Sequence, residues 1–581
     1  MKVHRFSTRR AVAVLMAFTL LITLLNGCQG GSSMSSASSS PGSSTATSAA
    51  SDDPNQKYTI TWLSGASPTT ENSIGEQYLE ETFNVDIQPI IVEAADYDQK
   101  IGVLLASGNI PDYIRVGSIN TLSDYTKQGI LKEIPVSDIQ QYMPKYYDLS
   151  IKVDPNIFTY SVFNGKNMGA AIVNAGGVYP VTVAIRADWL TNVGITKVPT
   201  TLEELEDAFY KFRNNDPDQD GKKDTYAMSM GADCVNGRKF QSIFGAYGVN
   251  PFCWRVGDDG KLEYGFVTED FKNALKLLQK WYNDGLIDPE FITDNYRTSG
   301  DDICSKFCQG ITGYLDSYSF DDHHWDNDGN LSAKWIANNE GWKQYYADNI
   351  ENPDLLYSRD NFYSMDDVKP DLPGPVYINM APVTGPEGNS GYVREGIVAT
   401  FAAVGKQVAD DPGKYHRILT ILETLATDED VYVNAQYGPE GMAWEIDSNG
   451  DKVFKADWPQ NELYHPQWLK TGNGTWANTM FQSNPDFMAV VGGARTKQRY
   501  RLGDVAMTYP YVENIVKISL PSLEDDNTLT DSMVNEFMIK AISQNIDIDA
   551  EFPKIVEQWN KQGGSKLTQE ANDWYTSIKQ Q

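Results

Sequence analysis

Short apolar strand patterns alternate with amphipathic helix patterns along most of this 581-residue chain. The segment VTVAIRADWL (181–190) is one example, because it indicates a buried strand that runs directly into a helix. Such alternation is typical of α/β folds, in which helices cover a sheet. About 525 residues follow the N-terminal region, and this is more than one hydrophobic core usually serves. The sequence therefore predicts an α/β protein with two or more lobes.

Three segments carry the clearest local signals. KYTITWLSG (57–65) alternates polar and apolar residues, as a first strand does. VPTTLEELEDAFYKFRNN (198–215) carries a capping box, Thr201 to Glu204, followed by apolar residues at helical spacing. VTEDFKNALKLLQKWYNDGLIDPEF (267–291) predicts another helix, with Thr268 as the N-cap and Gly285 at the end. Two further stretches, GDDGKLEYG and IDSNGDKVF, have the turn residues of β-hairpins.

The N-terminal region predicts the location of the protein. A basic start, an apolar run over 11–25 and the sequence LNGC ending at Cys28 make residues 1–27 a signal peptide. Its ending resembles a bacterial lipobox, in which cleavage exposes a cysteine that carries a diacylglycerol; an ordinary secretory signal is the alternative. The Ser-rich segment that follows, up to residue 56, is expected to be a flexible linker. We therefore expect a protein that is lipid-anchored through Cys28 on the extracellular face of the cytoplasmic membrane.

Charge excludes some partners. The formal net charge is −30 at pH 7, and removal of the four basic residues of the signal peptide takes it to −34. A field of this sign repels nucleic acid and anionic lipid headgroups, so neither is expected as a partner. It also weighs mildly against a highly anionic substrate, although the local charge of a site can differ from the total.

Four cysteines remain beside Cys28. Outside the cell they permit three disulfide pairings, and the sequence does not choose among them. We favour buried thiols or one bridge over a zinc site, because the spacing of Cys304 and Cys308 alone is a weak metal signal. The four are Cys234, Cys253, Cys304 and Cys308.

The loop NNDPDQDGKKDTY (214–226) predicts a calcium site. Counted from Asp216, it has carboxylates at positions 1, 3, 5 and 9, a glycine at position 6 and a backbone carbonyl, that of Lys222, at position 7. This is the ligand pattern of an EF-hand loop. Position 12 is Ala227 where an EF-hand has glutamate, and a strand or loop follows where an EF-hand has a helix. A solvated acidic loop is the alternative. The predicted ligands are Asp216, Asp218, Asp220, Lys222 and Asp224, and the predicted ion is a structural Ca²⁺.

The chain carries no specific catalytic signal. It lacks the phosphate-binding P-loop, the Gly-x-Ser-x-Gly nucleophile elbow and the His-Glu-x-x-His zinc helix. The pair His323–His324 lies in a polar turn and is expected to be solvated. Carboxylates are numerous enough for a glycosidase pair, but abundance alone does not indicate one. We therefore expect a protein that is not an enzyme.

Three stretches carry a family resemblance: residues 186–229, WRVGDDGKLEYG (254–265) and ALKLLQKWYNDGLIDPEF (274–291). They resemble the family 1 extracellular solute-binding proteins of carbohydrate ABC transporters, in particular the large, lipid-anchored Gram-positive type that is similar to alginate-binding proteins. The resemblance implies a two-lobe periplasmic-binding-protein-like fold (type II) whose lobes are joined by a hinge. It also implies a monomer that captures an oligosaccharide and delivers it to the permease subunits of an ABC importer. In the family the calcium loop commonly continues with glutamate, where this chain has Thr225.

Sugar recognition suggests which side chains bind the ligand. Sugars present apolar C–H faces and many hydroxyl groups, so flat aromatic rings and hydrogen-bonding side chains hold them. The resemblance places Trp254 at the tryptophan of the family's cleft and Glu440 in its Gly-x-Glu-Gly stretch. Each of the aromatic candidates could instead be a core residue, and Glu440 could cap a turn. The full set of candidates is Trp254, Trp444, Glu440, Trp62, Asp316 and Tyr318.

The expected lobes are each built from separate parts of the chain. We expect the N-lobe to comprise 57–178 and 397–440, and the C-lobe to comprise 179–396, with the calcium loop, and 441–581. A surface or sensory lipoprotein that binds glycan without transport is the alternative function. A glycoside hydrolase is a third possibility, and it would need two carboxylates about 5–10 Å apart across a cleft.

Overall fold

The structure is a computed structural model of the 581-residue chain. The signal peptide, Cys28, His323, His324 and most of the predicted linker lie outside the residues that it describes. Residues 1–49 and 50–581 form separate units, and all elements below belong to the second. The described residues are 52–63, 72–90, 97–173, 180–231, 234, 236–294, 302–318, 339–349, 364–368, 374–394, 396–448, 450–455, 487, 490–491, 503–523 and 527–579.

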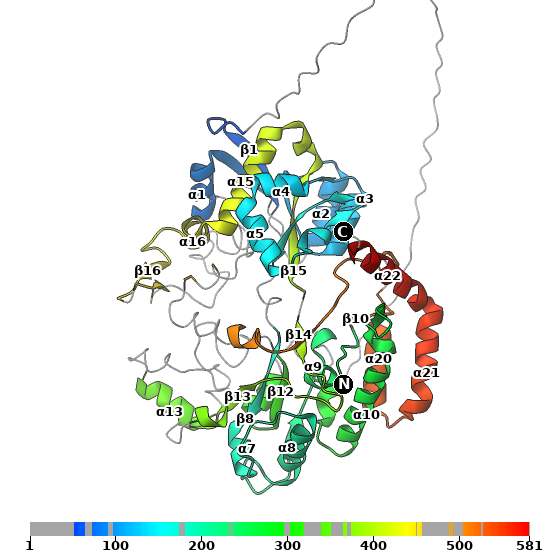
Figure 1. The fold of residues 1–581 in the computed structure, drawn as a ribbon. Coiled ribbons are helices and arrows are strands. Elements are labelled where there is room, and N and C mark those ends of the chain that lie inside the picture. Colours follow the sequence, from blue (N-terminus) through cyan, green and yellow to red (C-terminus); the bar gives the residue numbers. More distant parts are fainter. Residues whose placement is uncertain are drawn as a thin grey trace, which may run out of the picture. The chain divides into compact units, whose positions relative to one another are not determined.

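A first sheet forms around the N-terminal strand. Its strands are β1 (Tyr58–Leu63), β2 (Val85–Pro89), β3 (Tyr113–Val116), β4 (Leu131–Lys132), β7 (Ala170–Val173) and β15 (Val398–Gly405). The order is β2-β1-β3-β15-β4, with β7 also paired to β15. The pairs of β1 with β2 and with β3 are parallel, whereas β15 runs antiparallel to its three neighbours. The late strand β15 thus completes a sheet that the first part of the chain begins (Figure 1).

Helices cover this sheet, and together they enclose the hydrophobic core of the first lobe. The apolar residues of the strands, such as Ile60 and Ile114, are fully buried against them. Helix α1 begins at a capping box, Ser73 with Glu76. The helices are α1 (Ile74–Phe83), α2 (Tyr97–Ala106), α3 (Ile119–Lys127), α4 (Val136–Tyr142), α5 (Pro144–Val153), α15 (Pro412–Thr427) and α16 (Glu429–Tyr437). A small β-hairpin, β5 (Val162–Phe163) with β6 (Lys166–Asn167), precedes β7.

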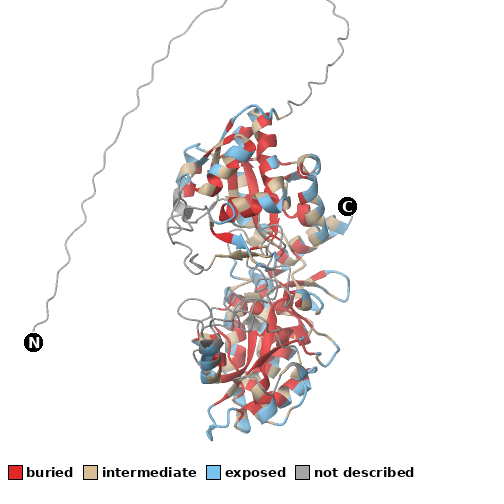
Figure 2. Ribbon diagram, turned by 90° about the vertical axis from the view of Figure 1, so that its left-hand side faces the viewer, coloured by how far each residue is buried: buried red, intermediate tan, exposed pale blue. Residues whose placement is uncertain are grey.

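A second sheet forms in the middle of the chain. Its strands are β8 (Thr182–Arg186), β9 (Tyr226–Met228), β12 (Thr312–Tyr318) and β13 (Tyr377–Met380), in the order β13-β8-β12-β9. β12 runs parallel to β9 and antiparallel to β8. A second, separate core surrounds this sheet, so the protein has a two-lobe α/β fold. In Figure 2 the buried residues of each lobe gather along its strands and on the inner faces of its helices.

The helices of the second lobe come from both halves of the chain. Helix α10 packs against α20 and α21, about 250 residues later in the sequence (Figure 1). The C-terminal segment therefore contributes to the second core. The helices are α7 (Ala187–Asn192), α8 (Leu202–Asn214), α9 (Gln241–Ala246), α10 (Glu269–Asn283), α11 (Asp302–Cys308), α13 (Glu340–Asn349), α20 (Ser532–Ser543), α21 (Ile548–Trp559) and α22 (Ser565–Lys579).

Three small strand pairs complete the described fold. The hairpin of β10 (Trp254–Val256) with β11 (Leu262–Tyr264) confirms the turn predicted in GDDGKLEYG. The hairpin of β16 (Trp444–Ile446) with β17 (Lys452–Phe454) confirms the second predicted turn. The third pair joins distant segments, since β14 (Tyr392–Arg394) runs parallel to β18 (Tyr511–Glu513).

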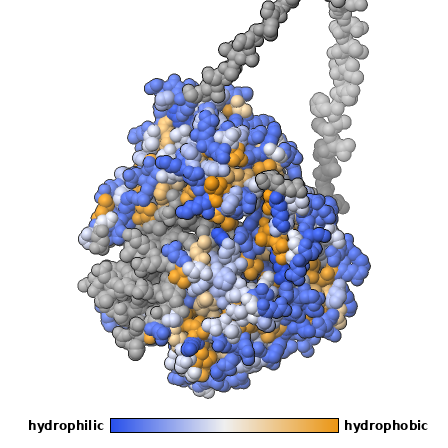
Figure 3. Space-filling view, in the orientation of Figure 1, coloured by the Kyte–Doolittle hydropathy of each residue, from blue (hydrophilic) through white to orange (hydrophobic). Residues whose placement is uncertain are grey.

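The predicted helix boundaries are confirmed in detail. The Thr201 hydroxyl accepts a hydrogen bond from the backbone N–H of Glu204. The Glu204 carboxylate in turn accepts one from the backbone N–H of Thr201. Thr268 accepts one from Phe271 and begins α10, and Gly285 follows the last turn with φ +74°. Among the described residues, no helix combines the length and the apolarity needed to cross a membrane. The face shown in Figure 3 is mainly hydrophilic, with apolar residues in small patches.

Candidate functional site

The aspartate loop joins the end of α8 to β9, and its two ends are anchored to the second lobe. The Arg213 guanidinium donates to the carbonyl of Thr225 at 2.8 Å and lies over the ring of Tyr226. The Thr225 hydroxyl donates to the carbonyl of Phe212 at 2.8 Å. Farther along the loop, Asn192 donates to the carbonyl of Pro217 at 2.7 Å. The loop between these anchors is therefore held in place by neighbouring elements.

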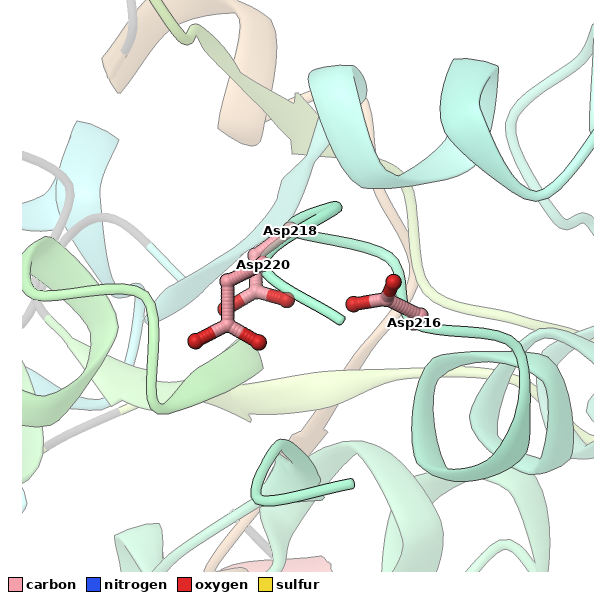
Figure 4. Close-up of side chains that lie close together, drawn as sticks. All are labelled: Asp216, Asp218 and Asp220. Carbon is pink, nitrogen blue, oxygen red and sulfur yellow. The ribbon is translucent and has the colours of Figure 1, made fainter. Parts of the chain in front are cut away.

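Three carboxylates of this loop converge on one point (Figure 4). Asp216, Asp218 and Asp220 each offer an oxygen atom, and these oxygens lie within 4.8 Å of one another. Gly221, at φ +82°, turns the chain so that its N–H donates to both oxygens of Asp216, at 3.1 and 3.3 Å. Burial, the charge of Asp220 and a hydrogen bond with Asp216 raise the pKa of Asp218. Three carboxylates this close repel one another, and a shared cation would relieve that repulsion.

The donor set fits calcium. Oxygens that bind one Ca²⁺ at 2.3–2.6 Å lie within about 5 Å of one another, as these three do. The ammonium group of Lys222 pairs with Asp220 and, with the Lys222 N–H, lowers the pKa of that carboxyl. A cation shared by the three aspartates would have to displace this ammonium from Asp220. Asp224 is exposed and stands outside the group of three, so its predicted role as a ligand stays a prediction.

Trp254 begins the β10–β11 hairpin and lies in the second core. Its ring centroid is 5.1 Å from that of Tyr264, its partner across the hairpin. The backbone N–H of Trp254 donates to the side-chain oxygen of Asn514 at 2.9 Å, and its backbone carbonyl accepts from the N–H of Ile515 at 3.0 Å. The hairpin is thereby fixed to the segment that follows β18. Only 2% of Trp254 is exposed.

A cavity of about 550 Å³ opens beside Trp254. The short helical turn at Asn236–Arg238, the start of β10, the end of β14 and the segment after β18 all line it. Its polar lining includes Arg238, Arg394 and Asn514, and its apolar lining includes Val516 and Leu520. A mixed lining of this kind suits a ligand that has both apolar faces and polar groups.

Two donors of this cavity make no hydrogen bond with any described residue. They are the indole N–H of Trp254 and the side-chain amide N–H₂ of Asn514. The Asn514 side-chain oxygen accepts two hydrogen bonds, from the backbone N–H groups of Trp254 and Val516. The sequence prediction named Trp254 but missed Arg238, Arg394 and Asn514. They are far from Trp254 in the sequence or carry no motif, and only the folded structure brings them together.

Other predicted ligand residues are buried in the lobes. Trp62 is 0% exposed, and its ring stacks on Tyr113 with centroids 4.0 Å apart. Asp316 is also 0% exposed, and its carboxylate accepts from the hydroxyl of Ser242 at 2.8 Å. Neither residue presents its side chain at a surface in this structure, and their binding of a ligand stays a prediction. Tyr318 ends β12, and its side chain lies outside the described residues.

Trp444 and Glu440 lie together near the β16–β17 hairpin. The Trp444 indole N–H donates to the carbonyl of Gly438 at 2.9 Å, and Lys452 lies over its ring at 5.7 Å. Trp444 is 6% exposed, in a small third cluster with Tyr432. Glu440 is exposed in the turn before it. Trp62, Trp254 and Trp444 thus belong to three different hydrophobic clusters, and their binding of one ligand stays a prediction.

The four cysteines of the described region are buried thiols, and none of them forms a disulfide. Cys304 and Cys308 lie one turn apart on α11, with their sulfur atoms 3.8 Å apart. Cys253 lines the cavity beside Trp254, and burial raises the pKa of its thiol to about 12. The thiol alternative of the sequence analysis is therefore confirmed, and the bridge is not formed.

Comparison with curated proteins finds relatives along most of the chain. The polygalacturonan/rhamnogalacturonan-binding protein YtcQ of Bacillus subtilis is 23% identical over 540 residues, which are 90% of this chain and 93% of YtcQ. The lipoprotein LipO of the same organism is 30% identical over 242 residues, or 39% of this chain and 44% of LipO. No protein-family model matches the sequence.

Solved structures share the fold. The ABC-transporter substrate-binding protein FusA of Streptococcus pneumoniae, solved in complex with kestose, superposes with a TM-score of 0.57. The match covers 90% of this chain and 99% of FusA at 17% sequence identity. A second FusA structure, of an EF-hand mutant in complex with fructo-nystose, gives a TM-score of 0.56 at 18% identity. These likenesses confirm the predicted two-lobe architecture.

Proposed function

We propose, on the premise that this chain belongs to the solute-binding proteins of carbohydrate ABC transporters, that it captures an oligosaccharide and delivers it to an importer. The proposed mechanism is closure of the two lobes about their connecting segments. Contacts that the ligand makes only in the closed state would drive that closure. The importer's permease subunits in the membrane are the proposed partners.

The cavity beside Trp254 is the observation that carries this proposal. Its volume of about 550 Å³ lies within the usual range of small-molecule sites, about 300–1,000 Å³. It contains the indole ring of Trp254 and two hydrogen-bond donors, the indole N–H and the Asn514 amide, that bond to no described residue. An aromatic ring can pack against the C–H face of a sugar, while the donors bind its oxygen atoms. The relatives' own ligands, which include a polygalacturonan and kestose, support a sugar as the ligand.

The Trp254→Ala variant is expected to bind its oligosaccharide at least about tenfold more weakly, because the sugar loses the ring against which it packs. Isothermal titration calorimetry against a panel of plant and bacterial oligosaccharides first identifies the ligand and then measures this loss. Trp254→Phe keeps a flat ring and is expected to retain part of the affinity.

Because Trp254 is also a core residue, the melting temperature of each variant is measured beside its affinity. Trp281→Phe is the matched control, since Trp281 is 0% exposed in the same core but does not line the cavity. Wild-type affinity in a folded Trp254→Ala protein would contradict the proposed site. Absence of binding to every oligosaccharide would contradict the proposed function.

The calcium proposal rests on the three converging carboxylates. Asp216, Asp218 and Asp220 would hold the ion, with the carbonyl of Lys222 and the carboxylate of Asp224 as further proposed ligands. The ion would supply positive charge between like charges at the junction of α8 and β9. Its proposed role is structural, because it stabilises the end of a helix in one lobe. The EF-hand of FusA, a protein that shares this fold, supports a metal-binding loop in this chain.

The proposed role is binding without catalysis. The relatives are binding proteins of transporters, and this supports the proposal. Prolonged incubation of the purified protein with its oligosaccharide, followed by chromatography, tests it directly. Recovery of the intact sugar is expected, and shorter products would favour a glycoside hydrolase.

The proposed lipid anchor at Cys28 is tested by Cys28→Ala in the full-length chain. A diacylglycerol holds a protein at a membrane through two buried acyl chains, so its loss is expected to release most of the protein into the medium. Immunoblots of membrane and medium fractions measure the distribution. Cys234→Ala is the control, because Cys234 is buried in the second core. Equal membrane retention of Cys28→Ala would contradict the anchor.

A further inference from the structure

We propose that the cavity beside Trp254 binds a carboxylated sugar, and that Arg394 is the residue that binds the carboxylate. This deepens the function proposed above and rests on it. The inference concerns the chemical class of the ligand, which neither the fold nor the calcium loop determines.

Arg394 is the last residue of β14 and lines the cavity. It is only 9% exposed, so water reaches little of its side chain. Its Nε–H is buried and has no hydrogen-bond partner among the residues that the structure describes. Within the described part of the chain, the guanidinium forms no ion pair and no side-chain hydrogen bond, and it lies over the ring of Tyr511. A buried charge without a hydrogen-bonded counter-ion is costly, and proteins usually satisfy it.

Two described residues beside Arg394, Tyr511 and Glu513, do not fill this role. The Tyr511 ring lies 4.7 Å from the guanidinium carbon, and this contact leaves the in-plane N–H groups without an acceptor. Glu513 is opposite Arg394 in the pairing of β14 with β18, but its carboxylate pairs with Lys517. The Arg394 fork is thus held in place by the ring and keeps its donors for another group. A planar carboxylate matches such a fork.

The other charged side chain that lines the cavity has the same sign as Arg394. Arg238 is a second arginine in the lining, and Asn514 and Trp254 add N–H donors. Among the described residues that line the cavity, none is acidic. This contrasts with the chain as a whole, which has 78 acidic and 48 basic residues. The strong negative charge weighed against an anionic ligand in the sequence analysis, whereas the local charge of this cavity favours one.

The test compares a sugar with its neutralised form. Tetragalacturonate, its tetramethyl ester and neutral galactotetraose are titrated into the purified protein by calorimetry at constant ionic strength. The wild-type protein is expected to bind tetragalacturonate about ten- to a hundredfold more tightly than the ester. The ester has no carboxylate, so it cannot form the charge-assisted hydrogen bonds that the acid forms. Wider oligosaccharide panels, including fructans, are titrated in parallel.

Arg394→Gln is expected to remove most of this discrimination, so that the acid and the ester bind with similar affinity. Arg394→Lys keeps the charge but loses the forked pair of N–H donors. Its preference for the acid over the ester is expected to lie between that of the wild type and that of Arg394→Gln. Lys261→Gln is the matched control. It removes the same charge from the β10–β11 hairpin, but the Lys261 side chain is 74% exposed and does not line the cavity. The melting temperatures of all variants show whether they are folded.

Each outcome decides the inference. Preference for the acid that disappears in Arg394→Gln and persists in Lys261→Gln supports it. Binding of neutral or esterified sugars as tightly as the acid overturns it and leaves the proposed function intact. Preference for the acid that persists in a folded Arg394→Gln overturns the role of Arg394. Failure to bind any oligosaccharide overturns both this inference and the proposed function.

Discussion

Gly245→Ala is expected to lower the free energy of unfolding by about 3 kcal/mol or more, because its methyl group would overlap a backbone atom that cannot rotate away. Gly245 lies in α9, and a Cβ there would stand 1.8 Å from the carbonyl oxygen of Gly391, just before β14. A Cβ added at Gly385 would likewise stand 1.8 Å from the carbonyl oxygen of Ala246. Helix α9 and the segment 385–391 therefore pack backbone against backbone. Urea unfolding followed by circular dichroism measures the loss.

The matched control is Gly102→Ala in α2 of the other lobe. Apart from its chain neighbours and the backbone of its own helix, no described atom lies within 4 Å of the position that its Cβ would occupy. Alanine is the better helix former, so this variant is expected to be as stable as the wild type or more stable by up to about 1 kcal/mol. A Gly245→Ala protein with the unfolding midpoint of the wild type would contradict the close packing of α9 on this segment. The same packing positions β14, and so the weakened variant is also expected to bind its ligand less well.

Chelation of calcium is expected to lower the melting temperature of the wild-type protein by about 5–10 °C. An ion present at a hundred times its dissociation constant stabilises the folded state by about 2.7 kcal/mol, and a lobe of this size converts each kcal/mol into about 2–4 °C. Differential scanning fluorimetry with calcium and with a chelator measures the shift. An unchanged melting temperature would contradict the metal site.

Asp218→Ala is expected to melt at a lower temperature than the wild type in calcium and to lose most of the response to chelator. Asp259→Ala is the control, because Asp259 is an exposed carboxylate at the tip of the β10–β11 hairpin. It is expected to respond as the wild type does. Asp224→Ala decides whether Asp224 contributes, since it stands outside the three converging carboxylates. A full chelator response in Asp218→Ala would place the ion elsewhere.

The local elements were predictable because their signals lie within a few residues of one another. Thr201 and Glu204 mark the start of α8 by a reciprocal pair of hydrogen bonds that span a single turn. Asp216, Asp218 and Asp220 converge because they alternate around one tight loop that Gly221 closes. The order of the strands depends on long-range pairing, such as that of β15 with β3, for which periodicity gives no register.

The proposed binding site was less predictable for a related reason. Trp254 could be named from a short motif, but whether an indole packs inward or faces a ligand depends on its neighbours. Trp62 carries a similar local pattern and is stacked on Tyr113 inside the first core. Arg394 and Asn514 sit in segments without a motif, and their relevance comes from the cavity that they share with Trp254.

The four buried thiols have a consequence for a protein proposed to work outside the cell. An oxidant or an alkylating reagent reaches such a sulfur only when the packing around it opens. At Cys253 the high pKa adds a second barrier, because a thiol that is briefly reached is still protonated at neutral pH. The folded chain therefore protects its thiols from oxidation without forming a disulfide. The rate at which each cysteine reacts with such a reagent then measures how often the structure around it opens.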